Sequence, residues 1–351
     1  MKAPEIIATI GHGSHHDGCV RELVAAGATV LRYNAATATL AETAARIARA
    51  RTALADEGLG RVPVMVDLPF PRRKHRLRTF AGAEHDVPRG QTFRFVACPE
   101  LQTAPDHVLV EVPALAEGVA PGEVLVVGDG ELAFRVARVL DASRFDAVAL
   151  TSWYLTDGKS VHLPRRAALP VDGPRYLAAS VSALAALQPE YLAFSFVETA
   201  EDMLCVIRLL AQAGCHWRPT LVAKLESRRA VGNVDGILVV TDAVMVARGD
   251  LAIEAPYEQL GLYQHRIIAR ARRRDVPVIV ATHILETTMT RYVPNRSEIV
   301  DLTNLVLAGV WGVLLAKETS APGNPVYPVT VARRIIDAVV GHAREEAGGR
   351  A

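Results

Sequence analysis

The sequence predicts an α/β fold, a (β/α)8 TIM barrel that carries a small β-barrel lid domain as an insertion. Three observations lead to this prediction: eight short apolar runs, helical segments between most of them, and one long gap filled with β-rich segments. A barrel of this kind takes about 250 residues. A chain of 351 residues therefore leaves room for an inserted domain.

The eight apolar runs are rich in β-branched residues and are hydrophobic throughout, without alternating polar positions. Strands of that composition are buried on both faces, as in a parallel sheet covered by helices. The runs are Ile6–Ile10, Val30–Asn34, Val64–Leu68, Tyr191–Val197, Leu221–Glu226, Ala243–Leu251, Val278–Thr282 and Gly312–Glu318.

Segments rich in Ala, Arg, Leu and Glu with the helical period separate most of these runs. Leu40–Asp56, Ala200–Ala213 and Pro256–Arg274 are long enough to be the helices that connect parallel strands. Eight such strand–helix units predict a closed barrel.

One gap, between Leu68 and Tyr191, interrupts this alternation. It contains short β-rich segments separated by Gly, Pro and Asp, which are typical of a small all-β module. The expected strands of this module are Thr92–Ala97, Val108–Val112, Glu123–Val127, Leu132–Val139 and Ala147–Trp153.

These observations divide the chain into three parts: residues 1–70 and 164–351 form the barrel, and residues 71–163 form the lid. The basic residues 72–76 mark the entrance to the lid, and residues 162–164 mark its exit. The basic segment is either a solvated hinge or a mouth that attracts anions.

The composition excludes several classes of protein. Lys and Arg number 39 and Asp and Glu 38, a net charge of +1, so we expect neither nucleic acid nor a membrane as the main partner. The apolar run at the N-terminus is too short for a signal peptide, and no later apolar stretch has the length of a membrane span. The four cysteines lack paired spacing, so we expect reduced thiols and a cytoplasmic location.

Polar side chains follow the apolar runs at the C-terminal strand ends, where such barrels place their catalytic residues. An arginine, a lysine and two carboxylates that converge there suit a hard divalent cation bridged to an anionic substrate, although any one of them alone could be a helix cap. Lys224 and Glu226 lie two positions apart, so both can point into the barrel mouth. The set comprises Arg32, Asn34, Asp67, Ser195, Lys224, Glu226, Arg248, Asp250, Thr282 and Glu318.

Three stretches, Ala223–Glu226, Met245–Leu251 and Ala281–Glu286, resemble signature stretches of the pyruvate kinase family and occur in the same order. Gly128–Gly130 and Lys159–Pro164 resemble the Asp-Gly turn and the return segment of that family's lid. The resemblance extends over almost the whole chain. It also includes Thr9–Gly11, Arg32–Asn34, Pro294, Arg296, Glu298 and Asp301.

The resemblance implies roles for individual residues. Glu226 and Asp250 would hold Mg²⁺ or Mn²⁺, and Lys224 would neutralise the phosphoryl group during transfer. Thr282 would lie beside the substrate carboxylate and near the route by which the enolate is reprotonated. These roles agree with phosphoryl transfer, which needs mainly positioning and charge neutralisation.

The resemblance implies further substrate contacts. The backbone at Gly249 and Asp250 would bind the substrate carboxylate, and Arg32 would bind the phosphate. Ser195 completes the expected substrate site.

The nucleotide half of the site departs from the family pattern. Asn34, Lys74 and Lys159 are the candidate nucleotide-binding residues, and Lys74 stands where the family has Arg. Ala36 and Thr37 replace the family's Ser and His. The strand-eight Ser-Gly of the family is replaced too, by residues 316–317.

The monovalent-cation site departs as well. Asp67 is kept, but Leu68 replaces a Thr and Ala36 a Ser, so neither offers a side-chain oxygen. Arg72 stands where the family usually has Glu, and where members that work without potassium have Lys. We therefore expect Arg72 to replace the cation, to pair with Asp67, and to make potassium unnecessary, unless Arg72 belongs to the solvated hinge.

The functional prediction is a metal-dependent phosphotransferase of the pyruvate kinase type. It would move phosphate between phosphoenolpyruvate and ADP, or another acceptor, through an enolpyruvate. The alternative is a divalent-metal-dependent lyase, aldolase or decarboxylase that acts on a pyruvate-derived 2-oxo acid, and the altered nucleotide half favours it. A non-catalytic metabolite-binding protein is disfavoured, because the implied catalytic residues are present.

The chain stops just after the expected eighth helix, so we expect no C-terminal regulatory domain and a monomer or homodimer.

Overall fold

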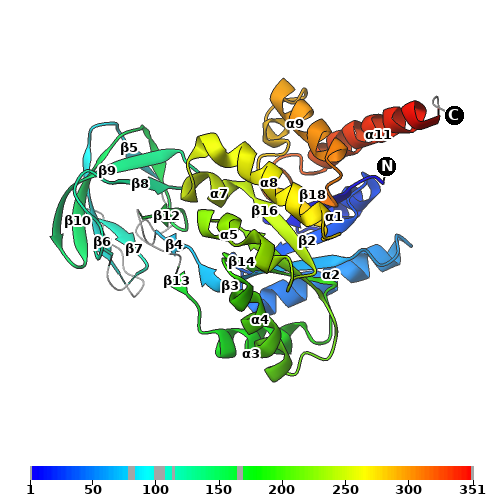
Figure 1. The fold of residues 1–351 in the computed structure, drawn as a ribbon, viewed down its shortest axis with the longest axis horizontal. Coiled ribbons are helices and arrows are strands. Elements are labelled where there is room, and N and C mark those ends of the chain that lie inside the picture. The colour runs from blue at the N-terminus through cyan, green and yellow to red at the C-terminus, as the bar shows by residue number, and fades with distance from the viewer. Residues whose placement is uncertain (1, 78–83, 99–106, 113–114, 164–168, 349–351) are drawn as a thin grey trace. The chain divides into compact units, whose positions relative to one another are not determined.

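The computed structural model describes residues 2–77, 84–98, 107–112, 115–163 and 169–348 (Figure 1). It divides the chain into two compact units. Met1–Pro71 and Val171–Ala351 form the first unit, and Arg72–Pro170 forms the second.

The first unit is a closed barrel of parallel strands, as predicted. Neighbouring strands pair in the order β1, β2, β3, β14, β15, β16, β17 and β18, and β18 pairs with β1 to close the barrel. The strands are β1 (Glu5–Ile10), β2 (Val30–Asn34), β3 (Val64–Arg73), β14 (Tyr191–Ser195), β15 (Thr220–Leu225), β16 (Ala243–Ala247), β17 (Val278–Ala281) and β18 (Gly312–Leu315).

Helices connect the strands and cover the outside of the barrel. Capping boxes precede some of them, including Thr39 with Glu42 before α2 and Thr199 with Asp202 before α4. Unpaired N–H groups in the first turn thereby gain acceptors. The helices are α1 (Asp17–Ala25), α2 (Leu40–Asp56), α3 (Gly173–Leu184), α4 (Ala200–Gln212), α5 (Arg228–Gly232), α6 (Val234–Ile237), α7 (Arg248–Glu254), α8 (Leu260–Arg272), α9 (Arg296–Leu307), α10 (Lys317–Ser320) and α11 (Val326–Gly348), with short 3-10 turns at Tyr257–Gln259 and Glu286–Met289.

The strands bury apolar side chains on both faces, which explains their continuous hydrophobicity. One set fills the barrel interior and includes Ile7, Met65 and Leu314. The alternate set, including Ile6 and Val66, packs outward in a larger core with the helices. The barrel interior is therefore a packed core, and the chemistry is left to the strand ends.

Five predicted barrel strands end earlier than expected, two of them by three residues or more. The run that begins at Ala243 stops at Ala247 because α7 follows, and the run that begins at Gly312 stops at Leu315 because α10 follows. Leu251 of α7 is fully buried although it lies beyond the strand, so a buried apolar residue at the far end of the run did not mark a continuing strand.

The second unit is a small all-β domain, also as predicted. Its main sheet has the order β4, β12, β8, β9, β10, β6 and β7, and a bridge between Leu77 and Val110 links its two ends. The strands are β4 (His75–Arg76), β6 (Thr92–Ala97), β7 (Val108–Val110), β8 (Val124–Val127), β9 (Leu132–Asp141), β10 (Arg144–Ala149) and β12 (Ser160–His162), with β5 (His85–Val87) and β11 (Trp153–Leu155) forming a separate pair.

One predicted strand of this domain was wrong. The run Ala147–Trp153 spans two strands, β10 and β11, which belong to different sheets. The chain turns between them, where the backbone of Leu150 and the hydroxyl of Thr151 bond to the start of β9 and its preceding turn. Hydrogen bonds to a distant segment, invisible in local composition, break the run.

The exit from the inserted domain falls partly outside the described residues. The sequence places it at residues 162–164, and residues 164–168 are not described. β13 (Leu169–Pro170) then pairs with β3. The boundary at residue 163 stays a prediction.

No described helix is long and apolar enough to cross a membrane.

Candidate active site

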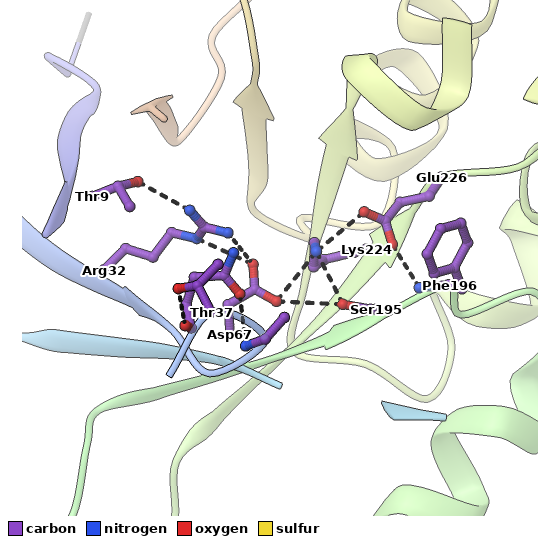
Figure 2. A network of polar contacts seen from close by, with 10 residues as sticks. Thr9, Arg32, Thr37, Asp67, Ser195, Phe196, Lys224 and Glu226 are labelled. Atoms are coloured by element: carbon purple, nitrogen blue, oxygen red, sulfur yellow. Dashed lines mark hydrogen bonds and ion pairs between the residues drawn. The ribbon is translucent and has the colours of Figure 1, made fainter. Parts of the chain in front are cut away.

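The polar residues predicted at the strand ends lie at the C-terminal ends of the barrel strands. Arg32 and Asn34 belong to β2, Asp67 to β3, Ser195 to the end of β14, and Lys224 to β15. Parallel strands bring these ends to one mouth of the barrel. Figure 2 shows that Arg32, Asp67, Ser195, Lys224 and Glu226 form a connected polar network there.

Lys224 occupies the centre of this network. Its ammonium lies 3.2 Å from Oδ1 of Asp67 and 3.1 Å from Oε1 of Glu226, and it donates to Oγ of Ser195 at 3.1 Å. Three acceptors match the three N–H groups of an ammonium. Burial alone would lower the pKa of Lys224, but the charges of Asp67 and Glu226 outweigh it and hold the pKa above its ordinary value.

Asp67 also binds the second cation of the network, Arg32. Nε and Nη2 of Arg32 donate to Oδ2 of Asp67 at 3.1 and 2.6 Å, and Nη1 donates to Oγ1 of Thr9 at 3.0 Å. Burial would raise the pKa of Asp67, but the charges of Lys224 and Arg32 hold it below its ordinary value. Asp67 is therefore a buried carboxylate whose charge is balanced by two cations.

Glu226 follows the last residue of β15 and is almost fully buried. Its Oε2 accepts a hydrogen bond of 2.6 Å from the backbone N–H of Phe196, and its Oε1 faces Lys224. Phe196 has φ +52, a left-handed conformation that costs about 1–3 kcal/mol for a residue other than glycine. The hydrogen bond to Glu226 helps to hold this conformation and fixes the carboxylate in turn.

Thr282 lies just after β17, beside the start of α7. A Cβ atom added to Gly249 would lie 3.1 Å from Cγ2 and 3.5 Å from Oγ1 of Thr282, so the two residues are in close contact. Thr282 and His283 have φ values of +76 and +53. Two consecutive left-handed residues without a glycine cost about 1–3 kcal/mol each, so their surroundings must hold this turn.

The carboxylates Glu226 and Asp250 fit a hard divalent cation. Both are oxygen donors and both are buried. The charge of each raises the pKa of Lys224, that of Glu226 more strongly than that of Asp250. Among the described residues no group of three or more His, Cys, Asp or Glu side chains could hold a metal. A cation here would therefore take its remaining ligands from water and substrate oxygens, as Mg²⁺ does in phosphoryl-transfer sites.

The predicted nucleotide residues occupy different parts of the chain. Oδ1 of Asn34 accepts from the backbone of Ala36, and the Thr37 hydroxyl donates to the Asn34 carbonyl, so Asn34 organises its own turn. Lys159, in the inserted domain, donates to the carbonyl of Tyr154 and lies 4.5 Å from the centre of its ring. A nucleotide role for these residues stays a prediction.

Arg72 and Lys74 belong to the inserted unit, which begins at Arg72. Asp67, the expected partner of Arg72, has Arg32 and Lys224 as ion-pair partners within the barrel. The replacement of a monovalent cation by Arg72 stays a prediction.

Sequence reasoning gave no role to two contributors to the site. Thr9 was noted only as part of a similar stretch, yet its hydroxyl binds Arg32. Phe196 contributes a backbone N–H, which no residue type signals in a sequence. Thr9 is a polar residue within the apolar run of β1, and this is the feature of the sequence that could have identified it.

Comparisons with known proteins point to one family. The family model of the pyruvate kinase barrel domain matches residues 1–331. Pyruvate kinase of Mycobacterium tuberculosis is 34% identical over 344 residues, which cover 95% of this chain and 70% of that protein. Pyruvate kinases of Methylorubrum extorquens (32% identical, 95% and 68% covered) and Thermococcus litoralis (30% identical, 94% and 68% covered) are also similar.

Proposed function

The chain belongs to the pyruvate kinase family, and we propose that it transfers phosphate between phosphoenolpyruvate and ADP through an enolpyruvate. It is an enzyme, a phosphotransferase of the pyruvate kinase type. The observation that carries this proposal is Lys224, a buried ammonium held among Asp67, Glu226 and Ser195 at the barrel mouth. The lyase considered as an alternative is not favoured, because the matching relatives are pyruvate kinases over 95% of the chain.

The cations of the network supply the charge that phosphoryl transfer needs. The contacts of Arg32 with Asp67 and Thr9 use three of its five N–H groups. Counted over the described residues, two N–H groups therefore remain for phosphate oxygens. The ammonium of Lys224 is fixed before substrate arrives. Donors already in place need no reorganisation during the reaction.

The start of α7 and the turn after β17 provide the other end of the substrate site. The backbone at Gly249 and Asp250 would bind the substrate carboxylate, with Thr282 in contact with Gly249. Thr282 would lie where a proton is delivered to the enolate. Glu226 and Asp250 would hold Mg²⁺ or Mn²⁺, which would polarise substrate oxygens and offset their negative charge.

We propose that the enzyme works without potassium. Asp67 already has its charge balanced by Arg32 and Lys224. Leu68 is fully buried and apolar, and Ala36 has no oxygen in its side chain. Arg72 would supply a fixed positive charge in place of the potassium ion.

We propose a cytoplasmic homodimer as the working form. Tyr292, Val293 and Val300, in and just before α9, are 76%, 67% and 57% exposed. Apolar side chains of this size favour contact with another protein surface, and a second copy is the proposed partner. Light scattering of the wild type and of Val300→Asp tests this, since the charged variant should remain a monomer.

The test of the function is incubation with phosphoenolpyruvate, Mg²⁺ and a panel of nucleotides, with pyruvate and the phosphorus signals followed together. Pyruvate should form only with a nucleoside diphosphate, and the triphosphate should appear in equal amount. Oxaloacetate decarboxylation, or enolate proton exchange without any nucleotide-dependent transfer, would contradict the proposal.

A further inference from the structure

Arg248, the first residue of α7, holds the backbone of the turn after β17. Its Nε and Nη2 donate to the carbonyl of Thr282 at 3.0 and 2.7 Å, and Nη2 also donates to the carbonyl of His283 at 3.0 Å. Its Nη1 donates to Oδ2 of Asp301 at 2.6 Å and to Oε1 of Gln264 at 3.4 Å. These contacts use all five N–H groups of the guanidinium, so none remains for a substrate.

A carboxylate holds the other half of the same turn. Oε1 of Glu318 accepts from the backbone N–H groups of Ile284 and Leu285 at 3.1 and 3.2 Å, and its Oε2 accepts from that of Ala316 at 2.7 Å. Two consecutive carbonyls therefore face a guanidinium, and the next two N–H groups face a carboxylate. Charge-assisted hydrogen bonds of this kind are about twice as strong as neutral ones.

This double hold explains how Thr282 and His283 keep left-handed conformations that the chain would not adopt by itself. α7 contributes to Thr282 twice. Arg248 binds its carbonyl, and the next residue, Gly249, contacts its side chain. The position of the Thr282 hydroxyl is therefore defined relative to the backbone that would bind the substrate carboxylate.

We propose that Arg248, held by Asp301, is a positioning residue that fixes Thr282 for protonation of the enolate. The proposal rests on the proposed function and deepens it. In this step the Thr282 hydroxyl gives its proton to the methylene carbon of the enolate and takes another from water, whose hydroxide returns to solvent. The electron pair of the carbon–carbon double bond forms the new C–H bond, a lone pair of the enolate oxygen re-forms the carbonyl, and pyruvate results. Arg248 acts only through the turn and does not contact the substrate.

A double-mutant cycle tests this role. Arg248→Met and Arg248→Lys are each made in the wild type and in Thr282→Ala, and deuterium exchange into the methyl group of pyruvate is followed by NMR with Mg²⁺. Arg248→Met should slow exchange and kcat by about 10²-fold, the cost of a misplaced group, with KM for phosphoenolpyruvate nearly unchanged. In the Thr282→Ala background the same change should cost little more, because the residue it positions is gone.

Conservative variants sharpen the result. Arg248→Lys should recover part of the rate, since an ammonium can bind one carbonyl but cannot match the planar fork of Arg. Asp301→Asn should give a smaller loss of the same kind, because it weakens only the hold on Arg248. Arg270→Met is the matched control. Arg270 lies on the neighbouring helix α8 and pairs with Asp235 of α6 at 2.6 Å, so its removal should leave the exchange rate and kcat unchanged.

Three results would overturn the positioning role. The first is that Arg248→Met causes its full loss of rate in the Thr282→Ala background as well. The second is that the loss disappears when Arg248→Met is assayed well below its melting temperature, and the third is that a rise in KM accounts for it. Exchange on pyruvate needs no phosphoryl acceptor. A wild type that exchanges protons but transfers no phosphate would therefore count against the proposed function and leave this cycle measurable.

Discussion

The side chains of Lys224 and Asp67 meet across the barrel mouth, with Nζ 3.2 Å from Oδ1, although their strands β15 and β3 are separated by β14. Both side chains point inward at the C-terminal ends of their strands, so curvature of the sheet brings them together. The pKa of the lysine lies above its ordinary value and that of the aspartate below, so both stay charged near neutral pH. The site therefore holds a charged ammonium, paired with carboxylates, before substrate arrives.

Loss of this ammonium should slow phosphoryl transfer more than it weakens binding. Lys224→Met is expected to lower kcat by about 10²- to 10³-fold, because the charge it neutralises is greatest in the transition state. KM for phosphoenolpyruvate should rise much less. Steady-state kinetics measures both values, and Lys2→Met, which removes an exposed lysine, is the control.

The same variant should keep proton exchange on pyruvate, since Thr282 and the divalent cation manage the enolate. NMR of the methyl group in deuterated buffer measures this exchange. Equal losses of exchange and phosphoryl transfer would show that Lys224 serves both steps.

Removal of a carboxylate should abolish divalent-ion binding. Asp250→Ala leaves Glu226 as the remaining protein carboxylate proposed for the ion, so activity should fall by several orders of magnitude with the fold intact. Calorimetric titration with Mn²⁺ measures the binding directly. Glu254→Ala, an exposed carboxylate on the same helix, is the control. Wild-type affinity in Asp250→Ala would refute the assignment.

Potassium should have little effect on the rate. Activity is expected to be similar in potassium and in potassium-free buffer with tetramethylammonium, because fixed cations take the place of the ion. Arg72→Glu should lose activity in the potassium-free buffer and regain part of it with added potassium. Strong stimulation of the wild type by potassium, or full potassium-free activity of Arg72→Glu, would reject the substitution argument.

The inserted domain should lose stability at acid pH through Asp146. Hydrogen bonds from Arg94 and then Arg138, each 2.8 Å from the carboxylate, hold the pKa of Asp146 below its ordinary value despite burial. The stabilisation is complete above the ordinary Asp pKa of about 3.9 and is lost as the pH falls through the lowered value. Asp146→Asn should therefore cost about 1 kcal/mol at neutral pH, given that both arginines are partly exposed.

Urea unfolding of the full chain at several pH values tests this. The difference between wild type and Asp146→Asn should be constant from neutral pH down to about pH 4 and shrink below it. Asp141→Asn breaks an exposed pair with Arg144 and should have a smaller effect at every pH. A difference that grows as the pH falls would contradict the sign of the pKa shift.

The architecture of this protein and most of its candidate site could be predicted from the sequence. Buried parallel strands must be hydrophobic on both faces, so eight continuous apolar runs predicted the barrel, and α2 runs from Leu40 to Asp56, as its periodicity predicts. Catalytic groups in such a fold stand at strand ends. Lys224 and Glu226 could therefore be selected as candidates from their positions alone.

Tertiary structure decided what local composition does not encode. The apolar Leu251 beyond β16 is buried as a strand residue would be, so the backbone of the folded chain was needed to show that a helix starts at Arg248. The left-handed turn at Thr282 and His283 is stable only because Arg248 and Glu318, distant in sequence, bind its backbone. A residue's type states which groups it can offer, but their partners are set by the folding of distant segments onto one another.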